Sequence, residues 1–98
     1  MKSIRIRFTN MKGRRVGKGI SELRQQRKLS PKQLAERVGI DDNYLQRLEE
    51  GYVPEVDFET LENIARALGV CERGKLTPEQ LINYFMDATK EDQQPILI

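Results

Sequence analysis

The chain has 98 residues, the length of one domain, so we expect one compact core. Hydrophobic residues make up 38% and charged residues 33% of the sequence, a polar but globular composition. No apolar run could span a membrane, and the charged N-terminus lacks the apolar stretch of a signal peptide. The absence of histidine excludes histidine-based catalysis, and a single cysteine, Cys71, argues against a zinc site and excludes an internal disulfide. We therefore expect a cytoplasmic protein without cofactor, metal or catalytic residues.

The net charge of +2 hides a strong asymmetry along the chain. Residues 1–28 contain ten basic side chains and one acidic one, whereas residues 29–98 contain seven basic and fourteen acidic ones. A basic third on an otherwise acidic domain is typical of a protein with one side facing a polyanion. A plain solvated basic tail has the same composition, so the charge alone does not decide between the two.

Residues 1–16 divide into two parts. The first alternates apolar and basic side chains, a period of two that predicts a short strand: Ile4, Arg5, Ile6, Arg7 and Phe8. One strand is not stable alone, so it must pair with another copy, pair elsewhere in the chain, or stay loose. The second part, residues 10–15, is polar and predicts a flexible basic arm.

Start and stop signals divide the rest of the chain into five short helices. The first is predicted over residues 18–28. Capping boxes, each with a proline at the first helical position, begin the second helix at Ser30 and the fifth helix at Thr77. Aspartates cap the third helix, at about 42–50, and the fourth: Asp41 and Asp57. Glycines end the second, third and fourth helices: Gly39, Gly51 and Gly69. Residues 52–56 are predicted to be a loop.

The expected organisation is therefore a basic arm or strand (1–16), an all-α five-helix domain (17–90) and a C-terminal tail (91–98). The fifth helix carries a wide apolar surface for so small a domain, and the tail ends in Ile96-Leu97-Ile98. Part of this surface closes the core. The surplus predicts a two-fold interface and hence a homodimer.

The second and third helices carry the motif that points to a function. Ala35, Gly39, Leu45 and Leu48 lie at relative positions 0, +4, +10 and +13. Two helices that cross steeply need a small residue at their closest approach, and the turn between them needs one residue of positive φ. The two leucines hold the third helix against the others. This spacing predicts a helix-turn-helix, whose second helix fits the major groove of DNA.

Residues 17–70 resemble the Cro/C1-type (lambda-repressor-like, or xenobiotic-response-element) helix-turn-helix family. The resemblance rests on Ile20-x-x-Leu23-Arg24, Leu29-Ser30-x-x-x-Leu34-Ala35, Val38-Gly39-Ile40, Leu45-x-x-Leu48-Glu49 and Leu61-x-x-Ile64-Ala65. It implies a five-helix, commonly dimeric, DNA-binding regulator of transcription. It also implies a buried link between Arg24 and Glu49.

The resemblance further implies which side chains face DNA. In the third helix these are Asp42, Asn43, Tyr44, Gln46 and Arg47, and at the start of the second helix Lys32 and Gln33 face phosphate. By side-chain chemistry, Arg47 suits guanine, Asn43 or Gln46 suits adenine, and Asp42 suits cytosine. The basic arm would add salt-dependent contacts, and its candidate residues are Arg5, Arg7, Lys12, Arg14 and Arg15.

Four departures from the family pattern stand out. Pro31 replaces a glutamine that contacts phosphate, and Lys28 replaces a glycine, so that a lysine would have to adopt a left-handed conformation. The loop before the fourth helix is about two residues longer than usual. Asp41 and Asp42 bring negative charge to the end that would face the groove.

The leading interpretation is a sequence-specific regulator of transcription, a repressor, that binds double-stranded DNA. The alternative is a protein-interaction module of the same fold, such as an antitoxin bound to a toxin or a partner of another regulator. An enzyme is disfavoured, because the sequence contains no nucleophile–base pair, phosphate loop or metal cluster. Exposure of Asn43, Gln46 and Arg47 favours DNA, whereas dominance of Asp41 and Asp42 favours a protein partner.

Overall fold

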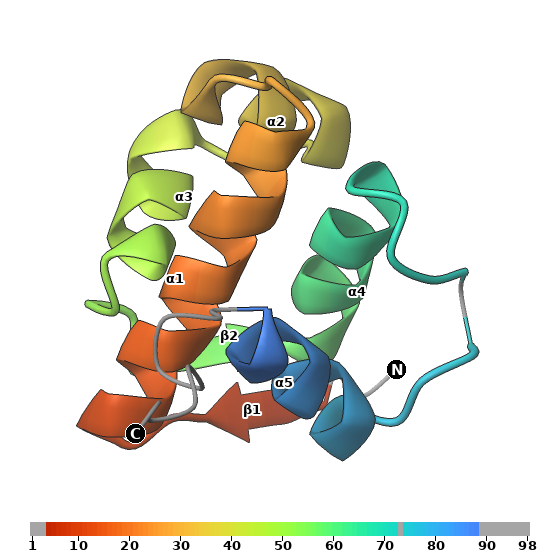
Figure 1. The fold of residues 1–98 in the computed structure, drawn as a ribbon. Coiled ribbons are helices and arrows are strands. Elements are labelled where there is room, and N and C mark those ends of the chain that lie inside the picture. The colour runs from red at the N-terminus through yellow and green to blue at the C-terminus, as the bar shows by residue number, and fades with distance from the viewer. Residues whose placement is uncertain (1–3, 73, 89–98) are drawn as a thin grey trace, which may run out of the picture.

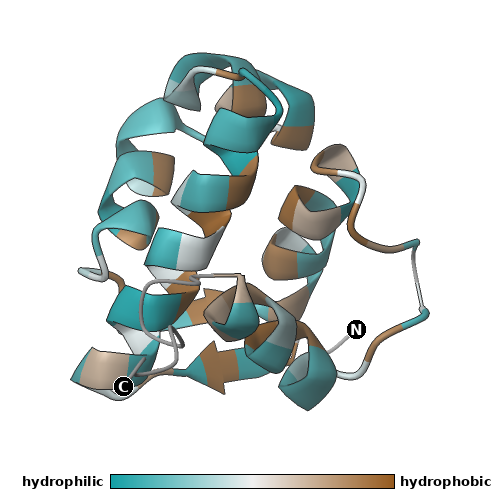
Figure 2. Cartoon of the chain, viewed as in Figure 1, coloured by the Kyte–Doolittle hydropathy of each residue, from teal (hydrophilic) through white to brown (hydrophobic). Residues whose placement is uncertain are grey.

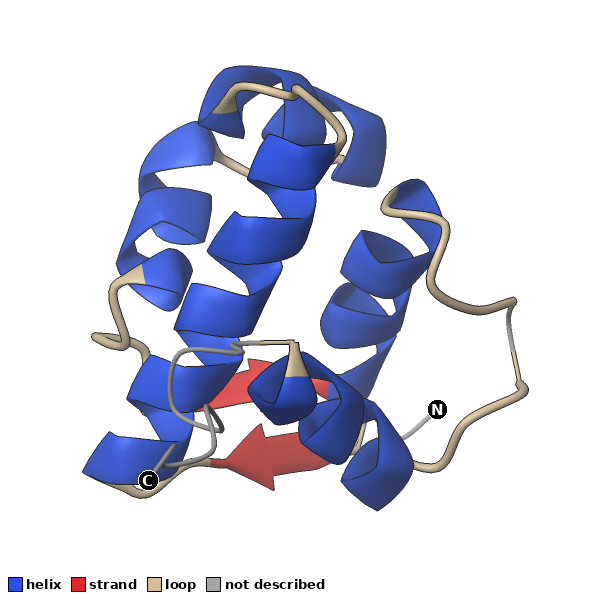
Figure 3. Cartoon of the chain, in the orientation of Figure 1, coloured by secondary structure: helices blue, strands red, loops and turns tan. Residues whose placement is uncertain are grey.

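The computed structural model describes residues 4–72 and 74–88, which form five helices and a two-stranded sheet (Figures 1 and 3). In chain order the elements are β1 (Arg5–Arg7), α1 (Asn10–Gln26), α2 (Pro31–Val38), α3 (Asp42–Glu49), β2 (Glu55–Asp57), α4 (Phe58–Ala67) and α5 (Pro78–Asp87). In Figure 1, α1 runs between α3 and α4, and the sheet lies near its N-terminal half. The tail with Ile96-Leu97-Ile98 lies outside the described residues.

All five helices contribute to one core. Each has at least one fully buried large side chain: Ile20, Leu34, Leu45, Leu61 and Phe85. Figure 2 shows the apolar, brown faces of the helices turned toward one another and the polar, teal faces turned outward. Because burial of one such side chain contributes about 1.5–3 kcal/mol, this core accounts for most of the stabilisation of the fold. Leu45 and Leu48, which are predicted to hold the third helix against the others, are both buried.

α1 begins eight residues earlier than the sequence predicts, at Asn10. Thr9 caps it, since its Oγ1 accepts a hydrogen bond from the Lys12 amide at 3.2 Å. Val16 and Gly13 are buried in the added turns. The prediction of a flexible arm over residues 10–15 is therefore wrong. Each glycine weakens a helix by about 1 kcal/mol relative to alanine, so the glycine-rich sequence does not predict a helix here. Tertiary packing stabilises the helix instead.

The two-stranded sheet resolves the open question about the N-terminal strand. β1 pairs with β2 of the same chain in antiparallel fashion, with Ile6 opposite Val56, and both side chains are buried. The prediction of a loop over residues 52–56 is thus wrong for Glu55 and Val56, because so short a strand gives no periodic signal by itself. β2 also lies within the connection that is longer than usual for the family.

The predicted caps hold with one exception. Ser30 and Thr77 form complete capping boxes, and Asp41 accepts a hydrogen bond from the Tyr44 amide at 3.2 Å. Asp57 occupies the N-cap position of α4 but makes no capping bond. Its Oδ1 instead lies 3.2 Å from Nε of Arg5, an ion pair without hydrogen-bond geometry. The prediction of Asp57 as the cap of the fourth helix is therefore confirmed for its position, but its side chain makes no capping bond.

Lys28 adopts a φ of 59°, the only positive φ at a non-glycine residue in the described part of the chain. A left-handed conformation costs a residue with a Cβ atom about 1–2 kcal/mol, and glycine avoids this cost. We expect Lys28→Gly to raise the free energy of unfolding by about 0.5–1 kcal/mol after the greater entropy of glycine in the unfolded chain is subtracted. Urea denaturation checks this. Lys28→Ala keeps the strain, so equal stability of the two variants would contradict the prediction.

Candidate nucleic-acid interface

The corner between α2 and α3 has the geometry that its sequence predicts. Gly39 ends α2 with a φ of 84°, and its amide and that of Ile40 both donate to the Ala35 carbonyl, at 2.8 and 3.0 Å. A Cβ atom at Gly39 would meet nothing within 4 Å, so the backbone conformation and not lack of space requires glycine here. Ala35 is 2% exposed where the helices meet.

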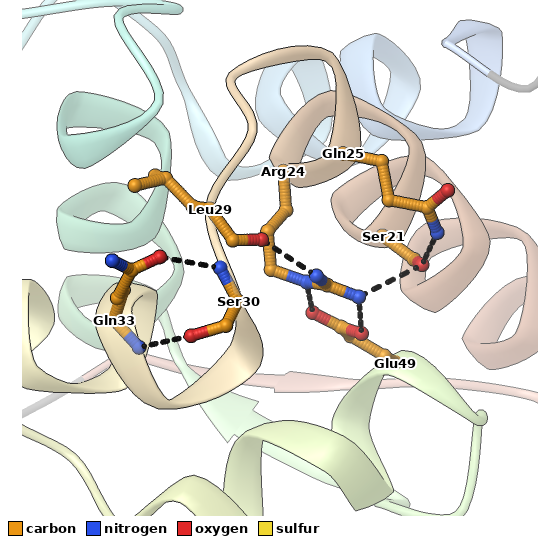
Figure 4. A network of polar contacts seen from close by, with 7 residues as sticks. All are labelled: Ser21, Arg24, Gln25, Leu29, Ser30, Gln33 and Glu49. Atoms are coloured by element: carbon orange, nitrogen blue, oxygen red, sulfur yellow. Dashed lines mark hydrogen bonds and ion pairs between the residues drawn. The ribbon is translucent and has the colours of Figure 1, made fainter.

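Arg24 joins α1 to α3 and to the turn before α2 (Figure 4). Its Nε and Nη2 donate to the two carboxylate oxygens of Glu49 at 2.8 and 3.0 Å, a bidentate pair. Its Nη1 donates to the Leu29 carbonyl at 2.8 Å. The side chains of Arg24 and Glu49 are only 11% and 8% exposed. The link that the resemblance implied is confirmed, and it fixes α3 relative to the rest of the domain.

The five candidate residues on α3 are not equivalent. Asn43, Gln46 and Arg47 are exposed, whereas Asp42 is half-buried. Leu45 and Leu48, which alternate with them along the helix, are buried in the core. Tyr44 is half-buried and packs against the core. Burial raises the pKa of its hydroxyl, the charge of Asp57 raises it further, and Arg5 lowers it. The described surface of α3 therefore offers two amides and one guanidinium to a ligand.

The two candidate residues at the start of α2 are both exposed. Lys32 is free to approach a phosphate. Gln33 belongs to the capping box. Its side-chain Oε1 accepts a hydrogen bond from the Ser30 backbone amide at 2.8 Å, and its backbone amide donates to Ser30 Oγ at 3.1 Å (Figure 4). Its side-chain NH₂ group remains available as a donor at the positive end of the helix dipole.

A family model described as Helix-turn-helix matches residues 20–81, well over half of the chain. The chain belongs to this helix-turn-helix family. The membership agrees with the lambda-repressor-like resemblance and with the five helices observed, and it indicates a DNA-binding regulator. A search of curated proteins found no match.

Within residues 4–72 and 74–88, no helix has the length and apolar character needed to cross a membrane. The same residues contain no group of three or more candidate ligands that could hold a metal ion. Cys71 is half-buried, and burial and Glu62 raise the pKa of its thiol, against a smaller lowering by Arg66. Since the thiolate is the reactive form, these surroundings disfavour the reactive form of Cys71.

The helix-turn-helix unit itself carries no excess of positive charge. From residue 31 to residue 49 there are three basic and four acidic side chains. One of these acids, Glu49, is neutralised by Arg24. Asp41 is exposed, but its carboxylate is used in the cap of α3. Electrostatic attraction to DNA must therefore come from outside α2 and α3.

The basic residues at the N-terminus fall into two groups. Arg5 and Arg7 lie on β1 and face acids on β2: Arg7 Nε is 3.5 Å from Glu55, and Arg5 contacts both Glu55 and Asp57. These pairs are solvent-exposed, with Arg7 at 88%, so they are weak and phosphate can compete for the arginines. The other group lies on α1, where Lys12 and Arg14 are exposed and Arg15 is half-buried with an unpaired Nε.

Arg14 lies beside the C-terminal end of α3. A Cβ atom added to Gly51, which follows α3, would lie 2.8 Å from Arg14 Cγ. Tyr52, the next residue, is 70% exposed. Residues 52–56 are predicted from the sequence to be a loop, so Tyr52 is not among the candidate residues. Its position directly after the glycine that ends α3 is the signal that could have marked it as a further candidate.

Proposed function

We propose that this protein is a transcriptional regulator, acting as a repressor, that reads double-stranded DNA by placing α3 in the major groove. The observation that carries the proposal is the division of α3 into two faces, with Asn43, Gln46 and Arg47 exposed and Leu45 and Leu48 buried. Asparagine and glutamine pair bidentately with adenine, and arginine with guanine. A domain that occupies its operator in this way excludes other proteins from it.

The start of α2 would hold the phosphate backbone beside the groove. Lys32 supplies a charge and its backbone amide, since Pro31 has no N–H and the Gln33 amide is bound to Ser30 Oγ, and the helix dipole adds to the attraction. Asp42 opposes this attraction unless it pairs with cytosine. We therefore propose that α2 positions the protein on the phosphate backbone and that α3 reads the base sequence.

Substitutions on α3 test the proposal. Arg47→Ala is expected to weaken binding to the selected DNA site by about 1–3 kcal/mol, which is roughly 5- to 150-fold, and to relax the preference at one base pair. Asn43→Ala and Gln46→Ala should do the same at neighbouring positions. Affinities for the cognate duplex and for single-base variants, measured by fluorescence anisotropy at fixed salt, check this.

The matched control for Arg47→Ala is Lys75→Ala, which removes one exposed positive charge outside the helix-turn-helix. It should change affinity much less and leave base preference unaltered. If Arg47→Ala changed affinity equally for all sequences, α3 would contact phosphate and not bases, and the proposed reading by Arg47 would be wrong.

Because α2 and α3 carry no excess of positive charge, we assign much of the salt-dependent affinity to the N-terminal bases. Each lysine or arginine that neutralises a phosphate contributes about 0.9 to the slope of log affinity against log salt. Lys12→Gln/Arg14→Gln should reduce that slope by about 1–2. Substitution is the appropriate test, because deletion of residues 1–16 would remove β1 and the buried Ile6 and Val16. An unchanged slope would exclude this assignment.

We further propose that the protein acts as a homodimer. Tyr84 is 44% exposed on α5. It lines a hollow of about 440 Å³ whose other lining residues are Leu23, Gln26, Asp87 and Ala88. The exposed ring of Tyr84 beside this partly apolar hollow supports a two-fold contact between copies. Such a dimer presents two recognition helices about one turn of DNA apart, which implies an operator with inverted repeats.

A further inference from the structure

A polar cleft lies between α2 and α4, near their C-terminal ends. We name it the Arg37–Arg66 cleft, and its lining residues are Arg37, Val38, Asn63, Arg66 and Ala67. Its volume is about 430 Å³, within the range of small-molecule sites. None of these residues is acidic, and none belongs to the candidate DNA contacts. The cleft therefore holds positive charge that the proposed function does not use.

Neither guanidinium group of the cleft is neutralised within the described part of the chain. The side chain of Arg37 is exposed and makes no ion pair or hydrogen bond within that part of the chain. Arg66 donates from Nη1 to the neutral Oδ1 of Asn63, at 3.4 Å. The helix dipole favours a basic residue in the last turn, which accounts for either arginine singly. Because α2 and α4 end beside the same hollow, the two arginines line it together.

We propose that the Arg37–Arg66 cleft binds the phosphate group of a small phosphate monoester. A phosphate monoester has three terminal oxygens and accepts hydrogen bonds from two guanidinium forks at once, whereas a carboxylate has only two oxygens. Because Oδ1 of Asn63 accepts from Arg66, the NH₂ group of that amide is left to donate to the ligand. Val38 and Ala67 supply apolar surface for the carbon part of the ester.

The ligand site goes beyond the proposed DNA binding and is tested without DNA. Glycerol 3-phosphate, inorganic phosphate and acetate are titrated separately into the ¹⁵N-labelled full chain and followed by NMR. We expect glycerol 3-phosphate to shift the amide signals of residues 37, 38, 63, 66 and 67, including the side-chain NH₂ of Asn63, with a Kd of about 1 mM or lower. Inorganic phosphate should act on the same signals more weakly, and acetate should have little effect.

Variants separate the cleft from general attraction to basic residues. Arg37→Gln and Arg66→Gln should each weaken binding at least about tenfold. Arg66→Lys keeps the charge but should still weaken binding, because lysine lacks the planar pair of donors of a guanidinium group. Lys75→Gln removes an exposed charge elsewhere and should leave the Kd unchanged. Arg37 and Arg66 are both exposed, so their substitution should not unfold the domain. The dispersion of the NMR signals verifies that each variant is folded. Absent shifts, equal shifts with acetate, or unchanged affinity in the glutamine variants would overturn the proposal.

Discussion

Replacing Arg24 by methionine is expected to lower the free energy of unfolding by about 3–5 kcal/mol, because it leaves the buried carboxylate of Glu49 without a partner. The variant also removes the donor to the Leu29 carbonyl, 2.8 Å away in the native chain. A domain of this size has only about 5–15 kcal/mol of stability in total, so Arg24→Met should be close to unfolding at 37 °C. Urea denaturation followed by circular dichroism measures the effect.

A double-mutant cycle separates the loss of the pair from the loss of packing. Glu49→Met alone should also cost about 3–5 kcal/mol, whereas Arg24→Met/Glu49→Met should cost much less than the sum, since no unpaired charge is left buried. The exposed pair of Arg5 and Asp57 is the matched control, and Arg5→Met should cost below about 1 kcal/mol. Additive effects at Arg24 and Glu49 would show that the two side chains do not act as a pair.

Replacing Gly19 by alanine is expected to destabilise the domain by about 3 kcal/mol, although alanine is the better helix former. A Cβ atom at Gly19 would overlap the carbonyl oxygen of Phe85, which is backbone and cannot rotate away. Gly17 is in the same situation against the carbonyl oxygens of Leu48 and Glu49. The two glycines let α1 approach α5 on one side and the end of α3 on the other. Thermal and urea denaturation of Gly19→Ala measure the cost.

Gly13→Ala provides the control for helix propensity on the same helix. Its Cβ atom would lie 3.3 Å from Cβ of Phe8, a half-buried residue at the end of β1 that can shift slightly. The gain in helix propensity of about 1 kcal/mol should therefore offset most of the crowding, and the variant should stay within about 1 kcal/mol of the native stability. If Gly19→Ala were as stable as Gly13→Ala, the close contact between α1 and α5 would be refuted.

Local signals predicted the central part of this fold well, for identifiable reasons. Ser30, Gly39 and Thr77 determine helix ends through their own backbone and side-chain geometry, so they act regardless of distant contacts. The pairing of Arg24 with Glu49 spans 25 residues and came from the family resemblance alone, since no local pattern encodes it. The strained Lys28 was likewise anticipated because the family has glycine there, and it was found at a φ of 59°.

The failed predictions share a different cause, since each depends on contacts between distant residues. The first turns of α1 contain glycines that a local scale disfavours, and they are helical because Val16 is buried in the core and Gly17 lets the helix pack against the end of α3. β2 is only three residues long and exists because β1 pairs with it. The candidate DNA contacts also depend on distant residues. Asn43 and Tyr44 are neighbours in the first turn of α3, and the local sequence does not show that Tyr44 packs against the core while Asn43 is exposed.

Selection of bound duplexes from a random-sequence DNA pool, repeated at several salt concentrations, decides whether α3 reads a DNA sequence. We expect an inverted repeat with half-sites about 10 base pairs apart from centre to centre, and loss of the motif in Asn43→Ala/Gln46→Ala/Arg47→Ala. A single half-site would contradict the dimer alone. Binding without any enriched sequence that vanishes by physiological salt would contradict sequence reading by α3 and would favour a protein partner, such as a toxin or another regulator, in its place.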